Sequence, residues 1–230
     1  MKLIFEDYVN ESKVPYGAGL TAIDIDETVF RTFAKILVRN TLTGKVVVEL
    51  DNQEFNSYKL KDNEEYDFGQ FRDAKFFRET SIPIPQTISR IKKMINSIET
   101  KGKESRIIFL TAREDFDNKD DVLDKFRDHG IKMDKSITYI ERAGNLKGGT
   151  IPERKEKILL KYLMTGKYRR VRLIDDHEPN VKALVGIEKK YGKDIENAVR
   201  KYYNISYDEP GPLVQYFGLW VKPDGSLKRI

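Results

Sequence analysis

The stretch TAIDIDETVF, residues 21–30, places three carboxylates within four positions directly after an apolar run. Crowding of Asp24, Asp26 and Glu27 raises local repulsion, which a cation, a partner base or water must offset. Asp24 and Asp26 are two residues apart, so both side chains can reach the same side of a strand that ends here. The stretch therefore predicts a buried strand whose carboxyl end carries a charged site.

The composition is that of a soluble globular protein, with 39% hydrophobic and 34% charged residues in a chain of 230. The chain has no cysteine, which excludes disulfides, thiol catalysis and cysteine-ligated metals and suits a reducing compartment. No apolar stretch approaches the roughly 20 residues that a membrane span needs. The start of the chain, MKLIFEDYVNES, is acidic where a secretory signal is basic. We therefore expect a cytoplasmic protein without a membrane partner.

The net charge is +5, with Lys and Arg scattered along the chain rather than clustered. An excess of basic residues favours anionic partners such as nucleic acid or phosphorylated small molecules. The charge alone does not distinguish between these partners.

Short β-rich runs alternate with amphipathic segments over most of the chain. The runs are 20–24, 106–111, 136–140 and 171–175, and the helical segments are 85–102, 118–130, 151–166 and 178–192. Each helical segment ends at a glycine, and three of them have a proline at or near the start. This alternation predicts an α/β fold with a doubly wound, Rossmann-like parallel sheet and helices on both faces.

Residues 31–80 interrupt this alternation. Residues 34–50, AKILVRNTLTGKVVVEL, form two β-rich runs around a Thr-Gly turn, which indicates a hairpin. We expect a small β-rich cap insert at 31–80, folded over the edge of the sheet, within a single domain whose core is about 15–30 and 81–205. The tail after Tyr203, rich in proline and glycine, is expected to be irregular but packed.

Asp24, Thr111 and Asp175 each occupy the end of a different predicted strand, and Asp176 adds a second acidic pair. In a parallel α/β sheet, ligands bind at the carboxyl ends of the strands. Carboxylates that converge there form a natural octahedral Mg²⁺ site, completed by water and a substrate phosphate. The simpler alternative for any one pair is a helix N-cap or a solvated loop.

Four motifs in order resemble those of the haloacid dehalogenase superfamily of phosphotransferases. They are DIDET (24–28), IIFLTAR (107–113), a lysine within PERKEKILLKYL (152–163) and LIDD (173–176). The resemblance covers roughly residues 18–190, and the 31–80 block lies where that superfamily inserts its cap. It implies a Mg²⁺-dependent phosphatase.

The resemblance also implies a role for each motif residue. Asp24 would be the nucleophile that accepts the phosphoryl group, and Asp26 the general acid and base. Thr111 would bind a phosphate oxygen. Asp24, the backbone carbonyl of Asp26 and Asp175 would ligate Mg²⁺, and Asp176 would ligate it through water or orient the motif lysine. Glu27 is expected to be a bystander that faces solvent or caps the next turn.

Two residues of these motifs leave alternatives open. Lys155 and Lys157 point about 200° apart on a helix, so only one can neutralise nucleophile and phosphate. Lys155 is preferred because it lies in the first turn, nearer the strand ends. Arg113 is either a contact to phosphate or nucleic-acid backbone, or a surface residue paired with Glu114 or Asp117.

For the substrate, the sequence TARE followed by an acidic run is similar to the phosphatase domain of phage-type polynucleotide kinase–phosphatases. That similarity implies nucleic-acid 3′-phosphate ends or nucleotides as substrates. The alternatives are a small-metabolite phosphatase, or a phage structural or binding protein that retains the fold. The first twelve residues resemble the leader of some phage head proteins, which would place the protein in a host cytoplasm.

Overall fold

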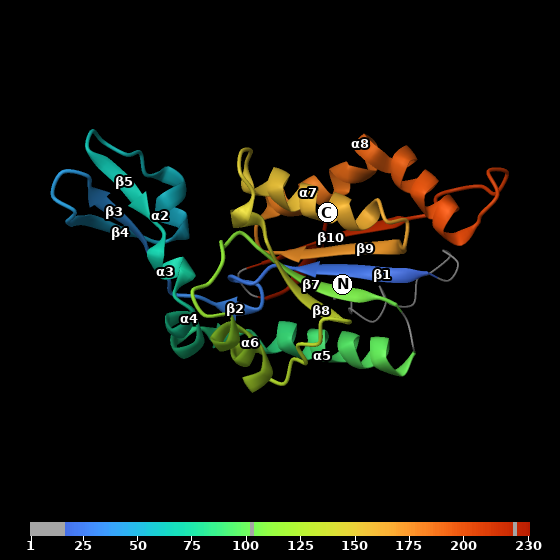
Figure 1. The fold of residues 1–230 in the computed structure, drawn as a ribbon, viewed down its shortest axis with the longest axis horizontal. Helices are drawn as coiled ribbons and strands as arrows, with labels where there is room; N and C mark the ends of the chain where they lie inside the picture. Colours follow the sequence, from blue (N-terminus) through green and yellow to red (C-terminus); the bar gives the residue numbers. More distant parts are fainter. Residues whose placement is uncertain (1–16, 102–103, 223–224) are drawn as a thin grey trace.

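The computed structural model describes residues 17–101, 104–222 and 225–230, so the expectations for the N-terminal leader and for Gly102 lie outside the described residues. Its main feature is a six-stranded sheet in the order β11-β10-β9-β1-β7-β8 (Figure 1). The strands are β1 (Ala18–Ile23), β7 (Arg106–Thr111), β8 (Thr138–Arg142), β9 (Tyr168–Asp175), β10 (Gln215–Val221) and β11 (Leu227–Arg229). All pairs are parallel except that of β10 and β11.

The strand that precedes Asp24 is central in the sheet. Ile23 of β1 lies opposite Phe109 of β7 and Ile174 of β9. From β1 the chain proceeds to β7 and β8 on one side, then returns to β9 on the other side and continues outward to β10. Strand order therefore reverses at β1, and the carboxyl ends of β7, β1 and β9 border the crevice where such sheets bind ligands.

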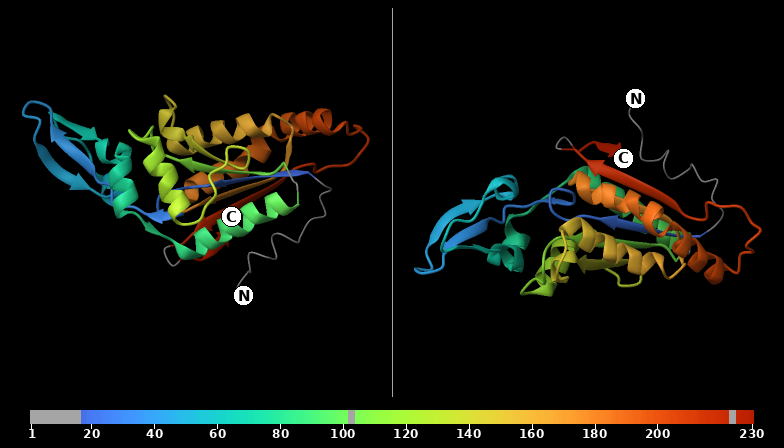
Figure 2. Two further views of the ribbon diagram at one scale, coloured as in Figure 1. Left: turned by 60° about the horizontal axis from the view of Figure 1, so that its bottom comes forward. Right: turned by 90° about the horizontal axis from the view of Figure 1, so that it is seen from above.

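Helices cover both faces of the sheet, which confirms the doubly wound fold. Helices α7 (Ile151–Leu163) and α8 (Glu178–Tyr203) lie on one face, and α5 (Pro85–Thr100) and α6 (Lys119–Asp128) on the other (Figures 1 and 2). Each pair buries its apolar stripe in a separate core: Leu159 and Leu184 contribute to one, Ile91 and Phe126 to the other. No helix of the described residues is long and apolar enough to cross a membrane.

Of two predictions about the C-terminal third, one is wrong and the other is right only in part. Helix α8 does not end at Gly192 but continues to Tyr203, because buried Ile195 and Val199 extend its apolar stripe. One helical glycine costs about 1 kcal/mol, less than the burial of two aliphatic side chains contributes. The tail is irregular only over residues 204–214, since it then supplies β10 and β11; it is packed as predicted, with Phe217, Leu219 and Val221 of β10 buried.

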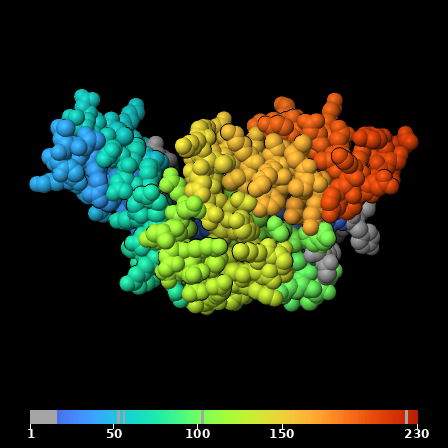
Figure 3. All heavy atoms as spheres, viewed as in Figure 1, coloured from blue at the N-terminus to red at the C-terminus, as the bar shows by residue number. Residues whose placement is uncertain are grey.

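The β-rich insert has a small core of its own. The predicted hairpin is β3 (Ile36–Asn40) and β4 (Val46–Leu50), and β5 (Glu64–Asp67) completes an antiparallel sheet in the order β4-β3-β5. Helices α2 (Asn52–Ser57) and α3 (Gly69–Arg72) follow β4 and β5. The insert forms a lobe beyond the carboxyl ends of the core strands (Figures 1 and 3). It therefore stands at the end of the sheet where the charged site was predicted.

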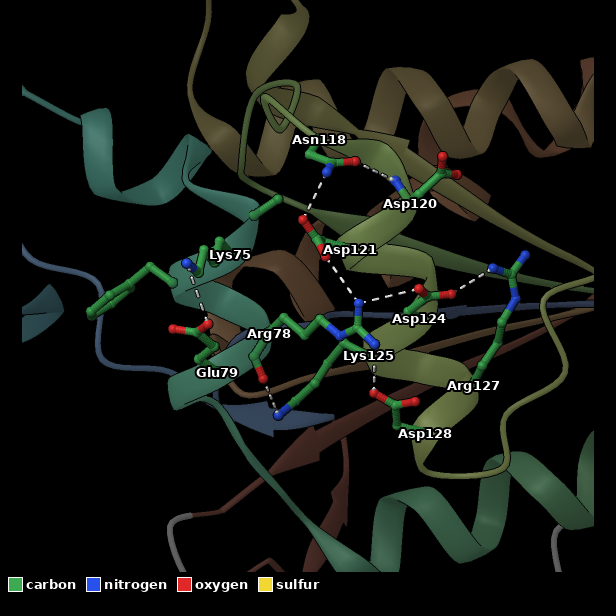
Figure 4. A network of polar contacts seen from close by, with 12 residues as sticks. Lys75, Arg78, Glu79, Asn118, Asp120, Asp121, Asp124, Lys125, Arg127 and Asp128 are labelled. Atoms are coloured by element: carbon green, nitrogen blue, oxygen red, sulfur yellow. Dashed lines mark hydrogen bonds and ion pairs between the residues drawn. The ribbon is translucent and has the colours of Figure 1, made fainter.

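Two chain segments connect the insert to the core, an outgoing limb that enters the insert and a returning limb that leaves it. Strand β2 (Phe30–Arg31) of the outgoing limb pairs with β6 (Ile82–Pro83) of the returning limb. Helix α4 (Ala74–Thr80) of the returning limb packs against α6, and Figure 4 shows the polar contacts between them. Arg78 contacts the carboxylates of Asp121, Asp124 and Asp128. Lys125 donates to the backbone carbonyls of Arg78 and Ser81, at 2.8 and 2.6 Å.

Gly218 provides a test of the tail strand. A Cβ on Gly218 of β10 would lie 2.6 Å from Cγ1 of Val181 in α8. We expect Gly218→Ala to destabilise the protein by about 1–3 kcal/mol through overpacking. A Cβ on Gly186 of α8 would meet no atom within 4 Å, so Gly186→Ala should stabilise by about 0.5–1 kcal/mol. Urea unfolding of both variants measures the difference, and equal free energies of unfolding would contradict the packing of β10 on α8.

Candidate metal centre

Three aspartates meet at the carboxyl ends of β1 and β9. One carboxylate oxygen each from Asp24, Asp175 and Asp176 lies within 4.8 Å of the others. Carboxylates more than about 8 Å apart could not share one Mg²⁺ at its usual ligand distances. Asp24 and Asp175 are buried, at 5% and 0% exposure. The described residues thus include a buried acidic group that could hold a metal ion.

The turn after β1 brings Asp24 to this position. Val29 and Phe30 both donate their N–H to the carbonyl of Ile25, and the N–H of Glu27 donates to the carbonyl of Phe30. Glu27 has a φ of 55°, and its side chain accepts from the N–H of Thr32 at 3.0 Å. Glu27 therefore shapes the turn. The hydrogen bonds of the turn use the carbonyl of Ile25 and the amide of Glu27. They do not use the carbonyl of Asp26, which was the backbone ligand expected from the sequence.

Lys155 lies between two of the aspartates. Its Nζ is 2.5 Å from Oδ1 of Asp24 and 2.8 Å from Oδ2 of Asp175, and the residue is 1% exposed. It belongs to the first turn of α7, which Pro152 and a capping box between Thr150 and Glu153 begin close to the strand ends. Lys157 is exposed. Of the two lysines considered, Lys155 is the one in contact with the acidic group.

The charges of this group do not balance. Three carboxylates and one ammonium carry a formal charge of −2. Burial raises the pKa of Asp24 well above its usual range, and Asp175 and Asp176 add to the rise although Lys155 opposes it. Burial and the charge of Asp175 likewise raise the pKa of Asp176 to about 7. The site therefore favours the gain of positive charge, which a divalent cation would supply.

The orientation of Asp175 is fixed from several sides. Nδ2 of Asn180 donates to both of its oxygens, at 2.9 and 3.0 Å, and the N–H of His177 donates to Oδ1 at 2.9 Å. Asn180 was not predicted from the sequence. Its signal is the spacing: it lies five residues after Asp175, in the first turn of α8, where a side chain can return to the strand end.

Thr28 supports Asp176, the third aspartate. Its hydroxyl accepts from the N–H of Asp176 at 3.1 Å, and Thr28 is fully buried. The ring N–H of Trp220 in β10 donates to the carbonyl of Asp176 at 2.7 Å. The tail strand thus helps to hold the loop that carries the acidic pair.

Asp26 lies outside the group of three, and its carboxylate faces Arg113. Nη2 of Arg113 is 2.6 Å from Oδ1 of Asp26, and Nε is 3.0 Å from Oδ2. The hydroxyls of Thr32 and Thr111 also donate to Asp26, at 2.8 and 3.4 Å. Burial alone would raise the pKa of Asp26, but the charge and hydrogen bonds of Arg113 bring it below its usual value.

Arg113 is buried, with 4% exposure, so the alternative of a surface residue paired with Glu114 or Asp117 is wrong. Its guanidinium carbon lies 4.8–5.3 Å from the ring centroids of Phe71, Phe77 and Phe116. Its Nη1 donates to the backbone carbonyl of Phe71 in α3 at 2.8 Å. Arg113 thereby joins Asp26 to the insert.

Comparison with known proteins gives no match. No family model fits the chain, and no curated protein or solved structure is significantly similar to it. The fold and the acidic group define an α/β protein with a mostly parallel sheet and a candidate metal site at the carboxyl ends of its strands.

Replacement of Lys155 tests the charge arrangement. Lys155→Met leaves the buried carboxylates of Asp24 and Asp175 without their cation, and breaking a buried ion pair in this way costs about 3–5 kcal/mol. Lys157→Met, on the exposed side of the same helix, should change stability by less than about 0.5 kcal/mol. Denaturant unfolding in metal-free buffer checks both. Equal stability of the two variants would contradict the contacts of Lys155.

Proposed function

We propose that the protein is a Mg²⁺-dependent phosphomonoesterase of the haloacid dehalogenase type, which acts through an aspartyl-phosphate on Asp24. The observation that carries the proposal is the buried position of Asp24 beside Asp175, Asp176 and Lys155 at the end of the central strand. A desolvated carboxylate at the position where strand order reverses is typical of a catalytic site. The four sequence motifs supply the reaction type.

The donor set fits Mg²⁺. Its ligands would be the carboxylates of Asp24, Asp175 and Asp176 and the carbonyl of Asp26, all hard oxygen donors. The formal charge of −2 matches a divalent cation. When bound, Mg²⁺ would offset the repulsion between the Asp24 carboxylate and a phosphate dianion.

The reaction has two steps on this chain's own groups. An oxygen of Asp24 attacks phosphorus, the bond from phosphorus to the ester oxygen breaks, and the leaving oxygen takes a proton from Asp26. Water then attacks the aspartyl-phosphate while Asp26 accepts its proton, which releases phosphate and restores Asp24. Lys155 and Thr111 bind phosphate oxygens in both steps.

The contact between Asp26 and Arg113 bears on the two roles of Asp26. A pKa below the usual value keeps Asp26 ionised, which suits its role as a base and opposes its role as an acid. Arg113 has the geometry for bidentate binding of a phosphate. Transfer of Arg113 from Asp26 to the substrate phosphate would raise the pKa of Asp26 and allow it to carry the proton.

Asp24→Asn tests the nucleophile. An amide cannot form the acyl-phosphate, so release of nitrophenol from p-nitrophenyl phosphate should fall to background while the circular dichroism spectrum stays unchanged. Sustained turnover by this variant, once mass spectrometry excludes deamidation to Asp, would contradict the role of Asp24 as the nucleophile.

Asp26→Asn tests the acid–base residue. Asp24 is retained and nitrophenolate leaves without a proton, so a burst of nitrophenol followed by slow turnover is expected. With an alkyl phosphate the loss should reach about 10²–10⁴-fold. Rapid-quench measurement of both substrates checks this, and equal losses on the two would contradict a proton donor at Asp26.

Removal of the metal tests the cofactor. Chelation by EDTA should abolish turnover, and excess Mg²⁺ should restore it. Mg²⁺ at about 100 times its dissociation constant should also stabilise the fold by about 2.7 kcal/mol, measured as a rise in melting temperature. Asp175→Asn should lose this rise. A wild-type melting temperature that does not change with Mg²⁺ counts against the metal site.

The substrate class is the finer part of the proposal. We propose nucleic-acid 3′-phosphate ends or nucleotides, with a small-metabolite phosphatase as the alternative. Phosphate release from a 3′-phosphorylated oligonucleotide, mononucleotides and sugar phosphates, compared as kcat/KM, separates the two. Absence of turnover on the whole panel, with the metal bound, would favour a binding protein on this fold.

A further inference from the structure

A groove of about 280 Å³ lies between α6 and β8, outside the acidic group. Strand β8 is the last strand on its side of the sheet, so the groove runs along an outer strand of the core. Residues 115–142, which include both elements, lie on the face shown in Figure 3. The proposed reaction uses no residue of this groove.

The lining of the groove is strongly cationic. Lys119, Arg127, Lys135 and Arg142 line it, against the single carboxylate of Asp115. Arg142 is 2.8 Å from Asp115, and Arg127 is paired with Asp124. Within the described part of the chain, neither Lys119 nor Lys135 forms an ion pair, and both are exposed. Two lysines are therefore available to an anionic ligand.

The floor of the groove is apolar. Val122 of α6 and Ile140 of β8 form part of it, with Met133 from the segment between the two elements. Phe116 and Tyr139 also line the groove, and Tyr139 is 37% exposed. A ligand that fits would combine a flat apolar part with negative charge.

The groove adjoins the surroundings of the candidate metal centre through Phe116 and Arg142. The ring of Phe116 lines the groove and lies 5.3 Å from the guanidinium carbon of Arg113, which contacts Asp26. Arg142 lies opposite Thr111 in the register of β7 and β8. Phe116 and Arg142 thus join the groove to the residues around Asp26 and Thr111.

We infer that this groove binds single-stranded nucleic acid, with a base on the apolar floor and the backbone phosphates against Lys119 and Lys135. Cationic grooves with aromatic rings bind single strands in this way without reading sequence. The inference deepens the proposed function, since it assigns the phosphatase a polynucleotide end as substrate. Binding itself does not depend on turnover, so each can be tested separately.

The binding experiment uses the full chain and a fluorescein-labelled single strand of about ten nucleotides without terminal phosphates. Fluorescence anisotropy at several salt concentrations gives the affinity and its salt slope. The double change Lys119→Glu and Lys135→Glu should weaken binding at least about tenfold and reduce the salt slope by about 1.4, as expected for two lost phosphate contacts on a single strand. Tyr139→Ala should weaken binding with an unchanged slope.

Lys189→Glu with Lys193→Glu is the matched control, because both are exposed lysines of α8 on the opposite face of the sheet and the pair changes the net charge equally. It should change the affinity by less than about twofold, which removes the effect of net charge alone. Unchanged affinity of the double variant would overturn the inference. So would a glutamate-rich peptide that binds as tightly as the oligonucleotide and loses affinity in the same variants, since the groove would then fit an acidic protein.

Turnover separates the groove from the catalytic proposal. The double variant should retain the wild-type kcat/KM on p-nitrophenyl phosphate and lose at least about tenfold on a 3′-phosphorylated oligonucleotide. If the oligonucleotide binds in the groove but the protein has no phosphatase activity, the inference about the groove is supported and the proposed function is contradicted. Equal losses of kcat/KM on both substrates would instead indicate that these lysines bind phosphate in general, and would contradict the inference that the groove binds nucleic acid.

Discussion

A buried lysine between two buried aspartates is the constraint on which the site depends. Lys155 contacts Asp24 and Asp175, and none of the three can lose its partners without leaving a desolvated charge. The contact requires α7 to begin where β1 and β9 end, which the capping box at Thr150 and Pro152 provides. Asn180 then donates to the carboxylate of Asp175, and the hydroxyl of Thr28 accepts from the N–H of Asp176. The start of two helices and the end of two strands are thus set by one group of charges.

Most of the fold could be predicted because its signals are local. Short β-rich runs and amphipathic segments alternate along the chain, and a parallel sheet with helices on both faces follows from that alternation. The errors have a common cause. Gly192 and the prolines of the tail were given more weight than the apolar residues around them, yet Ile195, Val199 and Phe217 are buried and decide those segments. Tertiary packing overrides a local breaker where the breaker costs only about 1 kcal/mol.

The candidate site was predictable to the extent that it follows from strand ends. Asp24, Thr111 and Asp175 lie at those ends by the topology of a parallel sheet, and Lys155 by its place in a first helical turn. The environment of Arg113 could not be predicted. Three aromatic rings surround it, two of them from the 31–80 block and one from the segment after β7. That arrangement depends on how the insert packs against the core, and the spacing of residues in the sequence does not predict it.

The two limbs that leave and re-enter the core make the insert a replaceable module. Strands β2 and β6 bring its ends together, and the contacts of Arg78 in the returning limb with Asp121 and Lys125 of α6 join that limb to the core. The entropic cost of a connecting segment rises only by about 0.6 kcal/mol for each doubling of its length. Lobes of different size can therefore be exchanged at this junction without rebuilding the sheet. Over evolutionary time such a chain can change the surface that the lobe presents to the charged strand ends, while those ends stay the same.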